Sequence, residues 1–120
     1  MIVSFQDLEV YKKSKNLFPK IVTVVKKFPK DGSYLRNQIL RSGNSIHSNI
    51  AEGFGRSEAE FKQYLTRSLG SNNETISHLE DAYSSKYISH DLSEELIKDY
   101  TVLGKQIYTL REKWHKFKNV

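Results

Sequence analysis

The 120-residue sequence contains no cysteine, only two prolines and six glycines, and no long apolar run. Without cysteine, neither a disulfide framework nor a thiolate metal site can form. So little proline and glycine argues against a loop-rich or all-β protein. No segment approaches the roughly 20 apolar residues of a membrane span, and residues 1–13 lack the basic-then-apolar order of a secretory signal. We therefore expect one cytoplasmic domain with no membrane partner.

Apolar residues recur at steps of three and four along most of the chain, which is the spacing of one helix face. This periodicity predicts helices over residues 5–27, 33–52, 58–86 and 92–117. The last has the clearest pattern, an apolar seam sustained over nearly four heptads. Its members are Leu92, Leu96, Tyr100, Leu103, Ile107, Leu110, Trp114 and Phe117. Because short links make consecutive helices antiparallel, the expected fold class is all-α, a single up-down-up-down antiparallel four-helix bundle spanning residues 1–120.

Polar residues at the predicted helix starts fit known capping patterns. Ser57 followed by Glu60 forms a capping box for the third helix, and Asp91 with Glu94 repeats the pattern for the fourth. The second helix can begin at either Asp31 or Ser33.

The segment 41–57, RSGNSIHSNIAEGFGRS, contains the predicted turn between the second and third helices. We expect Gly53 to end the second helix in the left-handed conformation, which glycine adopts at little cost. Gly55 then keeps the turn tight. Two helices joined by so short a turn pack face to face.

Small residues inside these two helices predict a close approach. Folding the hairpin about residue 55 places Ser42 opposite Ser68, with Gly43 and Gly70 within about a turn of that level. An interior glycine costs about 1 kcal/mol relative to alanine. We therefore expect both glycines to be packing residues.

The formal net charge is +5 and the isoelectric point about 9.4, a moderate basic excess. In the expected topology the start of the first helix, the turn at 53–57 and the end of the fourth helix share one end of the bundle. That end gathers Lys12, Lys13, Arg56, Arg111, Lys113, Lys116 and Lys118, which are the candidate nucleic-acid-binding residues.

Two features strengthen this prediction and one reading competes with it. Arg56 stands beside a helix N-terminus, where backbone N–H groups attract anions. Tyr11, Phe54 and Trp114 are aromatic neighbours that can stack on unpaired bases. The competing reading is a solvated basic rim whose cations only complement the dipole of the fourth helix.

A polar group lies close to the predicted inner stripes of the second and third helices. It comprises Arg41, Ser45, Asn49, Glu52, Ser71 and Glu74, and with Gly53 and Gly55 it forms a candidate structural motif. Buried charges need partners. We therefore expect a buried hydrogen-bonded network that fixes helix register or forms a subunit contact. The alternative is a catalytic carboxylate pair built on Glu52 and Glu74.

No motif predicts a cofactor, a metal or an enzyme. The Gly53–Arg56 segment lacks the spacing of a phosphate-binding loop, and no strand precedes it. The four histidines show no metal-ligand spacing, and no nucleophile elbow is present.

The segment RSGNSIHSNIAEGFGR is followed by FKQYLTRSLGSNNE and preceded by FQDLEVYKKS and FPK. Together these motifs resemble the four-helix-bundle proteins encoded in intervening sequences of bacterial 23S rRNA genes. They are also similar to the accessory variability determinant proteins of diversity-generating retroelements. The positions that carry the resemblance are Ser45, Ile46, Asn49, Ile50, Ala51, Glu52, Gly53, Gly55, Arg56, Phe61, Tyr64, Leu65, Gly70, Ser71 and Glu74.

The resemblance implies a ring-shaped homopentamer of four-helix bundles, and the retroelement relatives bind nucleic acid and a reverse transcriptase. Two positions depart from the family pattern. Pro19 interrupts the first helix, where we expect a kink, and Ser14 replaces a common alanine.

The expected function is therefore that of a non-enzymatic oligomeric bundle that binds RNA through its basic end. The alternative is a protein-binding scaffold, or an accessory subunit of a nucleic-acid-handling protein, with no direct nucleic-acid role.

Overall fold

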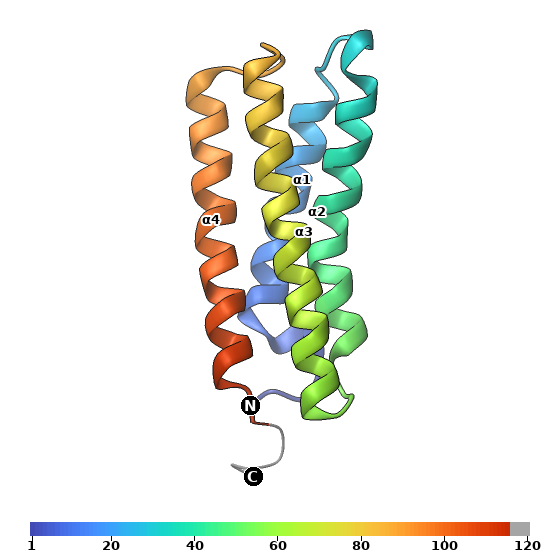
Figure 1. Ribbon diagram of the computed structural model, residues 1–120, viewed down its shortest axis with the longest axis vertical. Helices are drawn as coiled ribbons and strands as arrows, with labels where there is room; N and C mark the ends of the chain where they lie inside the picture. The colour runs from blue at the N-terminus through green and yellow to red at the C-terminus, as the bar shows by residue number, and fades with distance from the viewer. Residues whose placement is uncertain (116–120) are drawn as a thin grey trace.

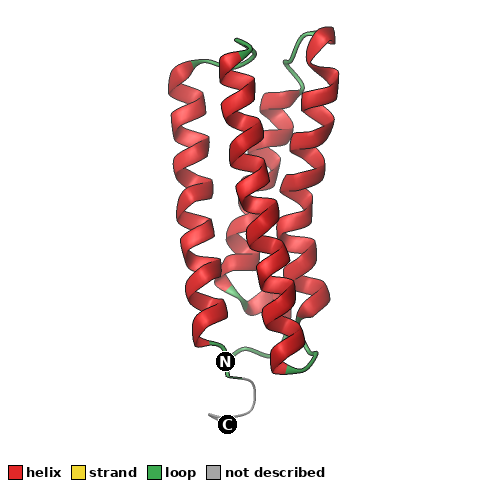
Figure 2. Cartoon of the chain, viewed as in Figure 1, coloured by secondary structure: helices red, strands yellow, loops and turns green. Residues whose placement is uncertain are grey.

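The computed structural model describes residues 1–115. Its four long helices are α1 (Glu9–Val25), α2 (Ser33–Gly53), α3 (Glu58–Ser84) and α4 (His90–Lys113), with 3-10 turns at Phe5–Asp7 and Lys30–Gly32. Within residues 1–115 the structure contains helices and loops and no strand (Figure 2). The helices alternate in direction along a rod of 50 × 21 × 19 Å (Figure 1). The predicted all-α four-helix bundle is confirmed.

Neighbours in the bundle are neighbours in the sequence. The most extensive contacts join α2 to α3 and α3 to α4, whereas α1 packs on α2 and makes its smallest contact with α4. Helices α1 and α3 lie diagonally, as do α2 and α4 (Figure 1). No helix of the described chain is long and apolar enough to cross a bilayer.

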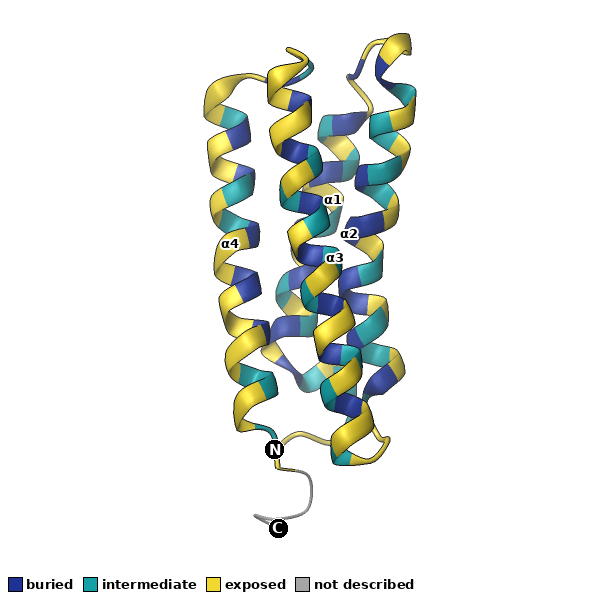
Figure 3. Cartoon of the chain, viewed as in Figure 1, coloured by how far each residue is buried: buried dark blue, intermediate teal, exposed yellow. Residues whose placement is uncertain are grey.

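The core follows the predicted apolar stripes. Each helix turns one buried face inward, and exposed residues cover the outside (Figure 3). Along α4 the seam residues Leu96, Tyr100, Leu103 and Ile107 are all buried. Burying one such aliphatic side chain contributes about 1.5–3 kcal/mol, so the stripes supply the main drive for helix packing.

The first helix begins at Glu9 and not at Phe5 as predicted. The Asp7 carboxylate accepts hydrogen bonds from the backbone N–H groups of Val3 (2.8 Å) and Ser4 (3.0 Å), and this lowers the Asp7 pKa. That local turn takes the 3-10 form, and Leu8 is extended, with ψ 130°. The chain then enters α1, which continues through Pro19 to Val25.

Other helix ends also differ from the sequence prediction. The hydroxyl of Ser89, not the carboxylate of Asp91, caps α4 by accepting the Leu92 N–H at 3.2 Å. The fourth helix ends at Lys113 because Trp114 is extended and turns back onto the core. Phe117 lies outside the described residues.

The start of α2 and both ends of α3 lie within about two residues of their predicted positions. Helix α2 is preceded by a 3-10 turn with Gly32 at its N-cap, so neither Asp31 nor Ser33 caps it. Helix α3 ends at Ser84, two residues early. The capping box of Ser57 at the start of α3 is confirmed.

Buried hydroxyl groups form hydrogen bonds between α2 and α3. The Thr75 hydroxyl donates to Ser42 Oγ at 2.8 Å, and Ser68 Oγ donates to the Ile46 carbonyl at 2.7 Å. Ser42 therefore faces Thr75 and not Ser68 as predicted. These two pairs place the pivot of the hairpin beyond residue 55.

The interior glycines play different parts. A Cβ atom on Gly43 would lie 2.4 Å from Ile21 Cδ1, so Gly43 is a packing residue as expected. Gly70 is exposed with no atom within 4 Å of the same position, so its predicted packing role within the chain is wrong. Gly104 is a packing residue that the sequence analysis did not single out. Its Cβ would lie 2.8 Å from the buried amide nitrogen of Asn72.

A buried histidine joins α1 to α2. His47 Nδ1 lies 3.0 Å from the Ser14 hydroxyl, and the ring packs edge-on against Tyr11 and Phe18. Burial, with a smaller contribution from Lys15, lowers the His47 pKa from 6.5 to about 4. Ser14, one of the two departures from the family pattern, thus gives this histidine a polar partner.

We expect opposite effects when Gly104 and Gly70 are each changed to alanine. In Gly104→Ala the new methyl group pushes against the side-chain amide of Asn72. That amide donates a hydrogen bond to the Tyr100 carbonyl at 2.8 Å, which the change would weaken. The substitution should lower the free energy of unfolding by about 1–3 kcal/mol. The control, Gly70→Ala, adds a methyl group that meets no atom of the same bundle, and in the monomer it should raise the free energy of unfolding by up to about 1 kcal/mol. Urea unfolding measures both, and a Gly104→Ala protein as stable as wild type would contradict the packing argument.

The His47 environment predicts acid sensitivity. Between pH 6.5 and about 4 the unfolded chain binds a proton at His47 that the folded chain excludes. The free energy of unfolding therefore falls as the pH falls through this window, by up to about 3 kcal/mol. His47→Gln lacks this titration, so its unfolding free energy should fall less over the same range. Parallel curves for the two proteins would show that His47 is not responsible.

Candidate nucleic-acid interface

Three segments that are distant in the sequence meet at one end of the bundle. The start of α1, the turn between α2 and α3, and the end of α4 lie together at the end of the bundle where the N-terminus is found (Figure 1). Trp114 follows α4, and the centre of its ring lies 6.1 Å from the centre of the Phe54 ring in the turn and 4.9 Å from that of Phe61 in α3. The predicted convergence is therefore present in the structure.

The turn itself is built by two glycines with different tasks. Gly55 has φ +91° and takes the left-handed conformation, whereas Gly53 is the last helical residue of α2. The prediction of a left-handed Gly53 is wrong. Gly53 is needed instead because a Cβ there would lie 2.4 Å from the Cβ of Tyr64. The Arg56 Nε donates to the Glu52 carbonyl at 2.9 Å and closes the turn.

The cations of this end stand among carboxylates. Ion pairs join Lys12 to Glu9 at 3.5 Å, Arg56 to Glu60 at 3.9 Å and Arg111 to Glu112 at 3.1 Å. The end is thus less basic than the topology alone predicted.

Two of the remaining predicted lysines, Lys13 and Lys113, lie within the described residues, and two do not. Lys13 and Lys113 have no ion pair within residues 1–115. Lys113 lines the same groove, of about 700 Å³, as Glu9 at the start of α1. Lys116 and Lys118 lie outside the described residues.

The aromatic residues predicted to stack on bases are packed into the bundle. Tyr11 lies against Phe5 at 4.9 Å, and Phe54 and Trp114 pack against core aromatic rings. These half-buried rings pack against the core and hold the helices together.

Two other tyrosines near this end contact arginine side chains. The guanidinium of Arg67 lies 4.7 Å from the centre of the Tyr64 ring, and that of Arg111 lies 5.1 Å from the Tyr108 ring. In both pairs the tyrosine stands three positions before the arginine on one helix face, a spacing that could have indicated the contact from the sequence. Neither tyrosine is among the functional residues predicted from the sequence.

The polar group of α2 and α3 forms a hydrogen-bonded ladder, as expected, but not a buried one. Arg41 binds the Glu74 carboxylate, which also lies 3.2 Å from His78 Nε2. Ser71 Oγ donates to Ser45 Oγ at 2.9 Å. The ladder is completed by Asn49, which donates to Ser45, and by Tyr64, which donates to Glu52.

This ladder lies along the outer edge of the α2–α3 contact. Arg41 and Glu52 are exposed, and Ser45, Asn49, Ser71 and Glu74 are half-buried. The prediction of a buried network is therefore wrong, because α3 presents Ser68, Asn72 and Thr75 to the core and leaves these residues at the rim.

The ladder lies apart from the three grooves described for the surface. Three of the grooves on the described surface, of about 530, 550 and 700 Å³, lie beside α4. Arg41, Glu52 and Glu74 line none of them.

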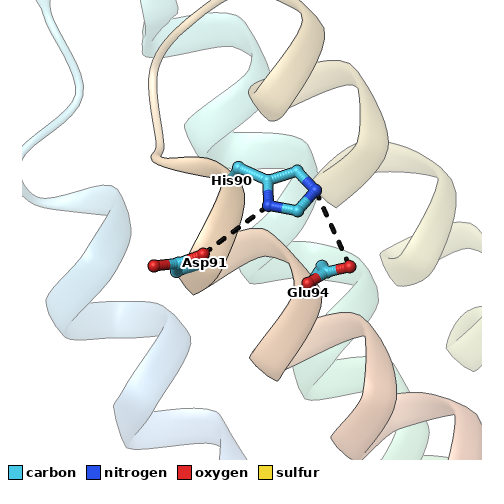
Figure 4. Close-up of side chains that lie close together, drawn as sticks. All are labelled: His90, Asp91 and Glu94. Carbon is cyan, nitrogen blue, oxygen red and sulfur yellow. Dashed lines mark ion pairs between the residues drawn. The ribbon is translucent and has the colours of Figure 1, made fainter.

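One group of described residues brings metal-ligand atoms together. His90, Asp91 and Glu94 at the start of α4 place these atoms within 4.8 Å of one another (Figure 4). All three are exposed, and the two His90 ring nitrogens face different carboxylates, each at 3.6 Å. A single ion can therefore use only one side of this ring, and the arrangement is that of surface ion pairs.

Comparison with known proteins identifies relatives. Residues 6–109 match the family model of the 23S rRNA-intervening sequence protein. The chain also resembles the crystal structure of a protein of unknown function from the S23 ribosomal protein family of Bacteroides thetaiotaomicron. That likeness has a TM-score of 0.80 and 31% sequence identity, and covers 87% of this chain and 96% of the other.

No curated protein matches the sequence. The family match nevertheless covers all four helices of the described chain, the fourth of them nearly to its end. The chain belongs to the 23S rRNA-intervening sequence protein family.

Proposed function

We propose that this protein is a non-enzymatic bundle that binds RNA through the basic end formed by Lys12, Lys13, Arg56, Arg111 and Lys113. The observation that carries the proposal is the convergence of three separate chain segments, each bearing cations, at one end of the rod (Figure 1). Phosphate binding needs several cations within reach of one backbone.

The carboxylates at this end do not prevent phosphate binding. The Lys12 and Glu9 side chains are 52% and 86% exposed, and those of Arg56 and Glu60 are 42% and 54% exposed. Exposed pairs of this kind contribute only about 0–1 kcal/mol. A lysine or arginine can therefore exchange its carboxylate for a phosphate at little cost.

We further propose that the bundle self-associates, since the family resemblance implies a homopentamer. Gly70 lies exposed in the middle of α3 although nothing within residues 1–115 needs its small size. Beside it runs the half-buried polar ladder, which a second protein surface can cover. Several copies of a weak basic end would gain RNA affinity through effective concentration.

The same two observations favour the second candidate function, a protein-binding scaffold without a direct nucleic-acid role. Such a scaffold would use the polar ladder for a partner protein, and its basic end would be incidental. The similarity to accessory variability determinant proteins stays a prediction.

RNA binding should depend steeply on salt and on the cations of one end. Lys13→Glu with Lys113→Glu should weaken binding of a labelled RNA at low salt by more than about tenfold, and should flatten the plot of affinity against salt. The matched control, Lys27→Glu with Lys98→Glu, makes the same charge change away from this end. Fluorescence anisotropy at several salt concentrations measures both. Equal losses in the two variants, or no RNA binding by wild type at low salt, would contradict the proposal.

Self-association should be visible as mass and should depend on Gly70. Light scattering is expected to give five times the 14.0 kDa mass of the chain. Gly70→Arg should lower that mass while circular dichroism stays helical, because the exposed site tolerates the side chain within one bundle. Thr101→Arg, on the exposed side of α4, is the control. A monomeric wild-type protein would remove this part of the proposal.

A further inference from the structure

Two arginines contact one tyrosine ring beside the turn between α2 and α3. The Cζ atoms of Arg56 and Arg67 lie 4.9 Å and 4.7 Å from the centre of the Tyr64 ring. Within residues 1–115, Arg67 has no ion pair with a carboxylate. The guanidinium of Arg67 is therefore positioned by the aromatic ring rather than by a charge.

The glycine-rich motif of the turn holds this stack in place. Gly53 leaves room for the tyrosine, because a Cβ atom there would lie 2.8 Å from Tyr64 Cγ. The Tyr64 hydroxyl reaches the Glu52 carboxylate at 3.5 Å, and Arg56 is tied to the Glu52 carbonyl at 2.9 Å. The motif thus does more than reverse the chain, since it fixes a tyrosine and an arginine against each other.

A second stack lies on the other side of α3. Arg111 of α4 lies 5.1 Å from the Tyr108 ring, which is 51% exposed. Its Nη1 donates to the Thr66 hydroxyl at 3.1 Å, and Thr66 is the neighbour of Arg67 in α3. The two stacks therefore flank the same part of α3. We call them together the arginine–tyrosine band, formed by Arg56, Tyr64, Arg67, Tyr108 and Arg111.

The chemistry of this band differs from that of the lysines. A guanidinium is planar, and unpaired RNA bases stack on arginine planes and on aromatic rings. An ammonium group offers a charge to phosphates but no plane. The bases of a duplex are already stacked inside the helix, so only a single strand can use such a surface.

We propose that the arginine–tyrosine band binds single-stranded RNA by stacking its unpaired bases. This inference rests on the RNA-binding function proposed above and names the form of RNA that is bound. The lysines at the end of the bundle, Lys12, Lys13 and Lys113, then contact the phosphates, and the band supplies the preference for accessible bases.

The test compares two labelled RNA strands of about 12 nucleotides. One is a uridine strand and the other is an abasic strand with the same number of phosphates. Wild type should bind the uridine strand at least about tenfold more tightly, because stacking on one aromatic residue can account for that factor. A duplex of the same length offers no unpaired bases, so raising the salt concentration should weaken its binding more than that of the uridine strand.

Arg67→Lys is the decisive variant because it keeps the charge and loses the plane. It should reduce the preference for the uridine strand several-fold and leave binding of the abasic strand unchanged. Arg36→Lys, in the first turn of α2 at the opposite end of the bundle, is the matched control and should change neither. Tyr64→Leu should act like Arg67→Lys, and its thermal unfolding shows whether the fold is kept.

The outcomes separate this inference from the proposed function. No binding of any strand at low salt overturns both proposals. Equal binding of the uridine and abasic strands, with normal salt dependence, leaves RNA binding intact and overturns base stacking. An Arg67→Lys protein with the full wild-type preference also overturns the role of the band.

Discussion

The close contact between α2 and α3 sets the geometry on which the rest of the bundle depends. Buried hydroxyl groups join the two helices, where Thr75 donates to Ser42 and Ser68 donates to the Ile46 carbonyl. These buried hydrogen bonds have only one register in which all partners are satisfied. The same register brings Arg41 to Glu74 and Tyr64 to the end of α2. A slip of one turn would break the core pairs, the surface ladder and the tyrosine–arginine stack together.

Much of the architecture could be predicted from the sequence because it depends on local patterns. Apolar residues at steps of three and four predicted the four helices, and Ser57 with Glu60 predicted the start of the third helix. The meeting of the α1 start, the turn and the α4 end followed from the short links alone. Helix ends were less predictable. At Asp7 and Ser89 the choice between neighbouring polar residues depends on hydrogen bonds that only the folded backbone defines.

The chemistry of the surface was harder to predict than the fold. Whether a polar residue is buried or lies at a rim depends on a rotation of a few tens of degrees about the helix axis. That rotation decided that Thr75 is buried and Glu74 half-exposed. The stacking residues posed the same problem, because Trp114 and Phe54 were needed in the core while Tyr64 and Tyr108 remained beside arginines. Sequence indicated which residue types were available, and tertiary packing decided their use.

The small contact between α1 and α4 makes the stability of the bundle uneven. Helices α2, α3 and α4 each pack on a neighbour over a long seam, whereas α1 is held chiefly by α2 and through the pair of Ser14 and His47. Segments with fewer packed neighbours open more readily than the molecule unfolds as a whole. Amide protons of α1 would therefore exchange with solvent before those at the α2–α3 contact. The chain thus consists of a firm three-helix unit to which a lysine-rich helix is attached along one side.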